Sequence, residues 1–257
     1  MVVFIYMNYI VLVTLFCCSY AIARKNNSLR IIGGNIDSDG KFPWAVALCV
    51  GEDKMMVCSG SLIHAEIVLT AAHCHANYIR LQKSEEYRKI LEIINHKDFS
   101  GNLNDIALYK VERSVIEHYA VLSSSDHFSL IGLEAFSAGY GLTKLLDIYN
   151  MDLLENTSNG SLKYASGVIE KCPITDSLSR HTLSCMFKKC KELGVAAMGD
   201  SGGPVIHDGK LIGINESNLH HTIQASYLHT SVVAFTPISP FLNWIQKNIA
   251  KLINVTK

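Results

Sequence analysis

The sequence predicts an all-β fold in two halves, with one α-helix at the C-terminal end. Short apolar runs recur along the chain between turn-forming Gly, Asn, Asp and Ser residues, which is typical of a β-barrel or a β-sandwich. The stretch "SSSD" at 123–126 lies near the middle and has the composition of a linker between two β halves. Apolar residues at helical spacing appear only in the last segment of the chain.

The expected strands follow from the apolar runs themselves. Each run is short and bounded by turn residues, and no long helical pattern interrupts the series. The runs lie at 44–50, 61–72, 90–96, 105–111, 133–141, 203–206, 209–215 and 231–238. The stretch 153–162 is polar and contains two glycosylation sequons, so we expect an exposed loop there.

The end of the chain has the pattern of an amphipathic helix. Ser239 is a residue type that caps helices, and Pro240 fits the first helical turn. We therefore expect one helix that packs on the strands. Its apolar face would consist of Leu242, Ile245, Ile249 and Leu252.

Composition limits the class of protein. The chain has 257 residues, of which 49% are hydrophobic, and this is enough for a sizeable core in one or two domains. The 23 basic residues match the 23 acidic ones. No basic patch or charged tail stands out, so nucleic acid is not an expected partner.

The N-terminal segment has the features of a targeting sequence. Residues 1–19 are almost wholly apolar, and Ala21 and Ala23 form a small-x-small pattern before Arg24. We expect residues 1–23 to be a signal peptide and the mature protein to be secreted, without membrane association. The usual positive n-region is missing and the run is just long enough to span a bilayer, so an uncleaved anchor is the alternative.

Secretion favours disulfide bonds between the cysteines that remain after the signal peptide is removed. These are Cys49, Cys58, Cys74, Cys172, Cys185 and Cys190. Sequons for N-glycosylation begin at Asn26, Asn156, Asn159, Asn215 and Asn254, and the sequence does not say which are occupied. The "HCH" at 73–75 has metal-binding residue types but no further ligands at the spacing of a zinc site, so we expect no metal.

Three polar residues offer the parts of a nucleophilic centre. His73 stands in "LTAAHCH", Asp105 in "LNDIALYKV" and Ser201 in "GDSGGP". A serine hydroxyl needs a base, the base needs an orienting group, and the developing oxyanion needs donors. Gly199 would let the backbone N–H groups of residues 199 and 201 point at one spot. Singly, these residues are also ordinary strand-end and turn residues, but together they favour catalysis.

The ordered motifs resemble those of the trypsin/chymotrypsin-like serine proteases. Besides "TAAHC", "NDIAL" and "GDSGGP", the segments "RIIGG" (30–34), "FPWAVAL" (42–48), "CSGSLI" (58–63) and "AGYGLT" (138–143) are similar to family segments, with Tyr140 replacing Trp. The resemblance runs from Arg30 to about Ile249. It implies two six-stranded antiparallel β-barrels and a C-terminal α-helix, divided near 123–126, with the active site between the barrels.

The resemblance also implies a role for each site residue. His73 would be the general base and then the acid, and Asp105 would orient it. The N–H groups of Gly199 and Ser201 would hold the oxyanion. The reaction would be hydrolysis of a protein or peptide substrate through an acyl-enzyme, without a cofactor.

The same resemblance implies a zymogen. A trypsin-like activating protease would cut after Arg30, removing the propeptide 24–30 and leaving the protease domain 31–257, expected to be a monomer. The new ammonium of Ile31 would pair with Asp200, which is otherwise an ordinary turn acid.

The disulfides that the resemblance implies are Cys58–Cys74 and Cys172–Cys185. Cys49 and Cys190 have no standard partners and are free or paired with each other. The short segment 78–95 lacks the acidic calcium-binding loop of many relatives, so we expect no calcium.

The implied specificity pocket departs from that of trypsins. Val195 would lie at its base, and Asn218 and Val233 would form its walls. Such a pocket has no countercharge for Arg or Lys. It favours a small or medium apolar residue before the cleaved bond, with a blocked pocket as the alternative.

Glu216 stands where the family has a serine that supports the catalytic aspartate. It would bring a second carboxylate near Asp105 and disfavour ionisation of both, unless the loop turns Glu216 to solvent. A glycan on Asn215 would lie beside the cleft.

The sequence leaves two possible functions. The intact set of catalytic residues favours a secreted serine endopeptidase, whereas the altered pocket and Glu216 favour a protease-fold binding or regulatory protein with weak or no catalysis.

Overall fold

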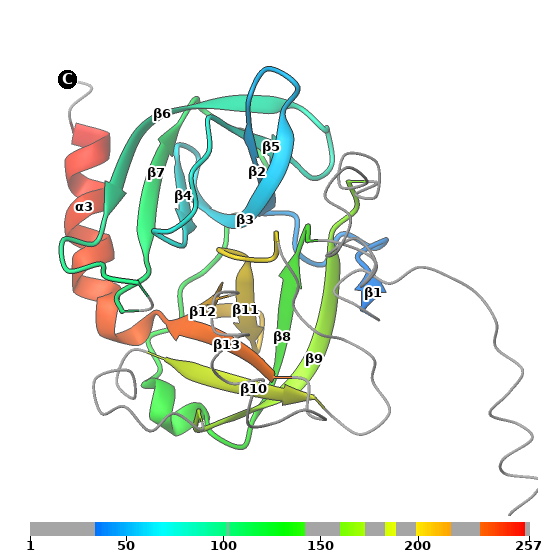
Figure 1. Ribbon diagram of the computed structural model, residues 1–257, viewed down its shortest axis with the longest axis vertical. Coiled ribbons are helices and arrows are strands. Elements are labelled where there is room, and N and C mark those ends of the chain that lie inside the picture. Colours follow the sequence, from blue (N-terminus) through cyan, green and yellow to red (C-terminus); the bar gives the residue numbers. More distant parts are fainter. Residues whose placement is uncertain are drawn as a thin grey trace, which may run out of the picture.

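Two closed antiparallel β-barrels form the computed structural model, which describes residues 34–101, 103–141, 160–172, 183–188, 199–216 and 232–254 (Figure 1). The first barrel closes in the order β2-β3-β4-β7-β6-β5. Its strands are β2 (Ala45–Val50), β3 (Met55–His64), β4 (Ile67–Thr70), β5 (Tyr78–Leu81), β6 (Tyr87–Asn95) and β7 (Ala107–Val111).

The second barrel closes in the order β9-β10-β13-β12-β11-β8, because β8 also pairs with β9. Its strands are β8 (Glu134–Gly139), β9 (Lys163–Glu170), β10 (Ser184–Lys188), β11 (Pro204–His207), β12 (Lys210–Glu216) and β13 (Val232–Pro237). The two-residue strand β1 (Asn35–Ile36) pairs with the beginning of β9. The predicted architecture of two six-stranded barrels is confirmed.

The strands form where side chains can be buried. Strand β4, "IVLT", is buried along its whole length, and so are five of the six residues of β2. Strand β9 instead alternates between buried and half-buried residues, as a strand with one face on the core does. Both patterns remove apolar surface from water, which is the main driving force for folding.

Some strands differ from the expectation. The run 61–72 forms the end of β3 and all of β4, with a turn at Ala65 and Glu66 between them. Strands β5, β9 and β10 were not anticipated. Each of them contains polar or charged residues among the apolar ones, so no continuous apolar run marks them.

The predicted C-terminal helix is confirmed. Helix α3 (Leu242–Asn254) lies along the first barrel beside β7, with Ile245 and Leu252 buried (Figure 1). The expected cap at Ser239 is wrong. A 3-10 turn (Ser239–Phe241) precedes the helix, and the Ser239 hydroxyl instead accepts the backbone N–H of His127 at 3.2 Å. Ser239 therefore links the start of the helical segment to His127 in the connection between the two barrels.

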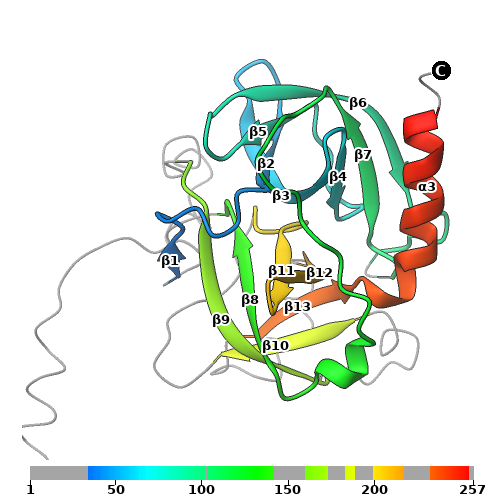
Figure 2. The same cartoon turned by 180° about the vertical axis from the view of Figure 1, so that it is seen from behind.

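The connection between the barrels is anchored along its path. Viewed from behind, the chain runs from β7 past both barrels to β8 (Figure 2). Within it, the N–H of Ser123 donates to the carbonyl of Leu211 at 2.8 Å. Asp126 accepts the N–H of Phe128 at 2.9 Å and caps a 3-10 turn, His127–Leu130. The stretch 123–126 thus separates the barrels while bound to the second one.

The disulfides Cys58–Cys74 and Cys172–Cys185 are both present. Cys49 carries a free, buried thiol, and burial raises its pKa to about 11. Cys190 lies outside the described residues, as do 1–33, which contain the predicted signal peptide and propeptide. Among the residues that the structure describes, no helix is both long and apolar enough to span a bilayer.

Candidate active site

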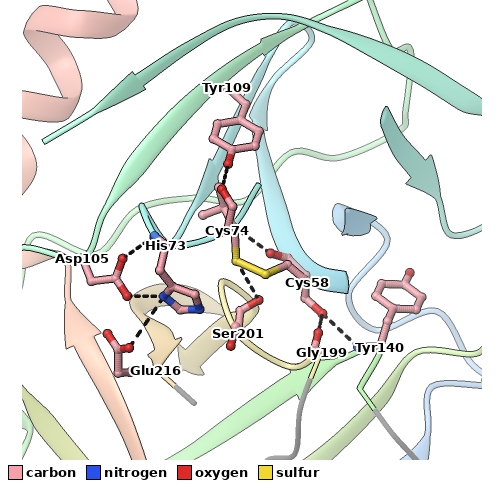
Figure 3. The surroundings of a disulfide bond; sticks show 11 residues. Cys58, His73, Cys74, Asp105, Tyr109, Tyr140, Gly199, Ser201 and Glu216 are labelled. Atoms are coloured by element: carbon pink, nitrogen blue, oxygen red, sulfur yellow. Dashed lines mark hydrogen bonds and ion pairs between the residues drawn. A yellow bond between two sulfur atoms is a disulfide. The ribbon is translucent and has the colours of Figure 1, made fainter. Parts of the chain in front are cut away.

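Strand pairing brings His73 and Asp105 together. His73 follows β4 by three residues, and Asp105 precedes β7 by two. The strands are antiparallel, with Thr70 opposite Ala107, so the end of β4 meets the start of β7. Both residues therefore lie at the edge of the first barrel that faces the second barrel (Figure 3).

The Asp105 carboxylate makes two hydrogen bonds to His73. Asp105 Oδ1 accepts the backbone N–H of His73 at 2.8 Å, and Asp105 Oδ2 lies 2.5 Å from His73 Nδ1. The aspartate side chain is completely buried, whereas 20% of the imidazole is exposed. These two hydrogen bonds to one carboxylate fix both the backbone and the ring of His73. Nε2 of the ring therefore points away from Asp105.

Asp105 is the ionised partner in this contact. Burial by itself raises the pKa of the Asp105 carboxyl, but hydrogen bonds from His73 and Glu216 and the charge of His73 outweigh burial and hold the pKa below its ordinary value.

Ser201 lies in a tight turn before β11. In Figure 3, Ser201 and Asp105 lie on opposite sides of the His73 imidazole. Gly199 has a φ of +91° and Gly202 a φ of +77°, in the left-handed region that favours glycine. A Cβ atom on Gly202 would lie 2.1 Å from Thr70 Oγ1 and 2.4 Å from the Ser59 carbonyl oxygen. The turn therefore fits against the first barrel only with glycine at this position.

Ser59 on β3 holds this turn, and the sequence analysis missed it. Its N–H donates to the Ser201 carbonyl at 2.8 Å. Its hydroxyl donates to the Gly199 carbonyl at 2.8 Å and accepts the N–H of Tyr140 at 2.9 Å. No local pattern could have identified this role, because Gly199 lies 140 residues further along the chain.

Asp200 is completely buried, and its Oδ1 accepts the N–H of Gly141 at 2.8 Å. Its predicted partner Ile31 and the cleavage residue Arg30 lie outside the described residues.

The predicted pocket residues are described only in part. Val195 and Asn218 lie outside the described residues. Val233, on β13, is buried in an apolar cluster of the second barrel that includes Met186 and Phe235.

Glu216, the last residue of β12, is buried beside the His73–Asp105 pair. Only 1% of its side chain is exposed, and Oε1 lies 3.7 Å from His73 Nδ1. The alternative in which Glu216 turns to solvent is therefore wrong. His73, Asp105 and Glu216 are also metal-binding residue types, with ligand atoms within 4.8 Å of one another. The 2.5 Å between His73 Nδ1 and Asp105 Oδ2 fits a shared proton, whereas ligands around one zinc ion would be roughly 3.4 Å apart.

Asn215 cannot carry a glycan in the folded protein. It is 1% exposed, its Oδ1 accepts the hydroxyl of Ser137 at 2.9 Å, and its Nδ2 donates to the Ala138 carbonyl at 3.1 Å. Of the five sequons, the one at Asn215 is therefore closed to modification in the folded protein, because the amide nitrogen is enclosed between strands. The side chain instead joins β12 to β8.

Comparison with known proteins agrees with this architecture. The model of the Trypsin family matches residues 31–245. Serine protease SP24D of Anopheles gambiae is 26% identical over 239 residues, covering 86% of this chain and 82% of the relative. Trypsin of Sus scrofa is 28% identical over 246 residues (86% and 96%), and serine protease SSP1 of Scolopendra subspinipes is 30% identical over 254 residues (85% and 83%). This chain therefore belongs to the trypsin family of serine proteases.

Proposed function

We propose that the protein is a secreted serine endopeptidase that uses Ser201 as nucleophile, His73 as general base and Asp105 as the residue that orients the base. Ser201 Oγ attacks the peptide carbonyl carbon while His73 Nε2 accepts its proton. The N–H groups of Gly199 and Ser201 stabilise the oxyanion. His73 then donates the proton to the leaving amine. In the second half of the reaction His73 takes a proton from water, the water oxygen attacks the acyl carbon, and His73 returns the proton to Ser201 Oγ as the acid product leaves.

The observation that best supports this proposal is the pair of hydrogen bonds between the Asp105 carboxylate and His73, one to the backbone N–H and one to the ring. An imidazole that donates from Nδ1 to a buried carboxylate presents the neutral Nε2 as a proton acceptor. The same carboxylate stabilises the imidazolium that forms when Ser201 gives up its proton. A purely structural histidine does not need this tautomer to be fixed.

Activation is the second part of the proposal. Residues 1–23 would direct secretion, and an activating trypsin-like protease would remove residues 24–30 by cleavage after Arg30. The ammonium of Ile31 would then pair with Asp200, whose side chain is buried. A buried carboxylate is costly without charged or hydrogen-bonding partners, so this ion pair would stabilise the turn that carries Ser201.

The substrate would be a protein or peptide with a small or medium apolar residue before the cleaved bond. Val195, Asn218 and Val233 supply no acidic group that could bind an Arg or Lys side chain. The active protein would be a monomer, because one chain carries every residue that the reaction needs.

The test is labelling with a fluorophosphonate probe before and after cleavage at the Arg30–Ile31 bond. We expect labelling only after cleavage, and none in the Ser201→Ala variant. An Arg30→Gln variant should resist both activation and labelling, and a peptide library would then report the specificity of the pocket. Folded, correctly cleaved protein that does not label would instead support the protease-fold binding protein.

A further inference from the structure

Glu216 contributes a second carboxyl group to the centre of the site. It reaches the His73–Asp105 pair from β12 of the second barrel, whereas the other two residues belong to the first barrel. The Glu216 and Asp105 side chains are exposed to no more than 1%. One carboxyl oxygen of Glu216 and one of Asp105 lie within 4.8 Å of each other. Two carboxyl groups this close in a water-excluded site disfavour each other's charge, which favours the state in which one of them keeps its proton.

The site can hold this proton in two ways. When it is on Glu216, Asp105 is charged and the imidazole is neutral. When it is on His73, both carboxylates are charged and the imidazolium lies between them. Both states have the same net charge, but only the first leaves His73 able to accept the proton of Ser201.

The distances favour the first arrangement. The His73 Nδ1–H is directed at Asp105 Oδ2 at 2.5 Å, whereas Glu216 Oε1 lies at 3.7 Å, beyond hydrogen-bonding distance. Glu216 therefore does not share the Nδ1 proton of His73. Placing an unshared charge on Glu216 would require ionising a second carboxyl group in a water-excluded site.

We propose that Glu216 keeps its proton at neutral pH and donates it to Asp105, which makes Glu216 a positioning residue for the base of the triad. This inference rests on the proposed function, since it assigns a role in the same reaction. Glu216 does not touch the substrate in this scheme. It fixes the carboxylate of Asp105, which in turn fixes the ring of His73.

A proton on Glu216 predicts that activity declines at alkaline pH, where Glu216 loses it. Among the described residues, the titratable groups that cluster with Glu216 are His73 and Asp105, with ligand atoms within 4.8 Å of one another. Tyr109, on β7, stays neutral because burial and the Asp105 charge raise its pKa, and its hydroxyl donates to the Cys74 carbonyl. On β13, Glu216 lies opposite uncharged Ala234. Loss of the Glu216 proton would thus put two bare carboxylates together, loosen Asp105 and lower activity.

Two variants separate the role of the donor from simple packing. Glu216→Gln keeps a donor of the same length that cannot ionise, whereas Glu216→Ala removes it. In the activated enzyme, Glu216→Ala should lower kcat by about tenfold or more, as expected for loss of a hydrogen bond to a charged group. Glu216→Gln should restore most of that loss and abolish the alkaline decline of the pH–rate profile. Glu117→Gln, at an exposed glutamate, is the matched control.

An infrared difference spectrum between the wild type and Glu216→Gln gives a readout that needs no activity. We expect the carbonyl stretch of a protonated carboxyl group at neutral pH in the wild type, absent from the variant. Absence of this band, faster turnover by Glu216→Gln at neutral pH, or equal loss in the Gln and Ala variants would overturn the proposal. If Glu216→Gln does not fold, disappearance of the wild-type band in alkaline solution tests the same point. The band in a protein that no fluorophosphonate labels would refute the proposed function but not the proton on Glu216.

Discussion

The hydroxyl of Ser59 donates a hydrogen bond to the carbonyl of Gly199 at 2.8 Å. This bond joins β3 of the first barrel to the turn that carries Ser201. It fixes the peptide unit that follows Gly199, while the Ser59 N–H binds the Ser201 carbonyl. One residue of the first barrel therefore sets the direction of the backbone at both proposed oxyanion donors.

Ser59→Ala should lower kcat by about tenfold and leave KM within a factor of about two. The change removes two neutral hydrogen bonds of the hydroxyl, each worth roughly 1 kcal/mol, and the oxyanion donors matter most in the transition state. Steady-state kinetics on the activated enzyme measure both constants. Ser114→Ala is the control, since Ser114 is equally buried and its hydroxyl donates to the Glu112 carbonyl instead. Equal effects of the two variants would mean that Ser59 acts only through general stability.

Asp105→Asn should lower kcat at neutral pH by about 10³-fold or more, because the amide cannot stabilise the imidazolium and favours the wrong tautomer. The probe-labelling rate provides the measurement, and near-UV circular dichroism verifies that the variant folds. A loss smaller than tenfold would argue against Asp105 as the orienting residue.

The free energy of unfolding should depend on pH in the acid range through Asp105. The pKa of Asp105 is lower in the folded protein than its ordinary value of 3.8. Its stabilising contribution is therefore complete above that ordinary value and is lost as the pH falls through the folded pKa. Denaturant titrations between neutral and acid pH should show a smaller acid-induced loss in Asp105→Asn than in the wild type.

Gly202→Ala should destabilise the fold by about 3 kcal/mol or more, because backbone strain and overpacking act together. The added Cβ would lie 2.1 Å from Thr70 Oγ1, at a residue whose φ is +77°. Gly209→Ala is the matched control. Its φ is +70° but nothing lies within 4 Å, so strain alone should cost about 1 kcal/mol. Denaturant midpoints of the two variants measure the difference, and equal midpoints would contradict the packing described for Gly202.

Cys49 should react slowly with a disulfide reagent at pH 8 in the native protein and quickly in denaturant. The thiol is buried, and burial raises its pKa to about 11, so little thiolate forms at pH 8. Comparison with Cys49→Ala isolates this thiol from Cys190. Fast labelling of Cys49 in the native protein would show that the first barrel opens readily around β2.

The sequence by itself identified the candidate catalytic residues and predicted the two β halves and the C-terminal helix. These were readable because apolar runs, helical spacing and the residues of "TAAHC", "NDIAL" and "GDSGGP" are local or ordered along the chain. The pairing of β4 with β7 then brought His73 against Asp105, and their contact agrees with the order of the motifs.

Only the tertiary structure decided the role of Ser59, the burial of Glu216, the enclosure of Asn215 and the contact of Ser239 with His127. Strands β5, β9 and β10 were also missed by the sequence analysis, because polar or charged residues interrupt their apolar runs. Each of these features depends on segments far apart in the chain. Hydrogen bonding and burial at such contacts depend on what the fold brings opposite a residue, and a local pattern does not contain that information.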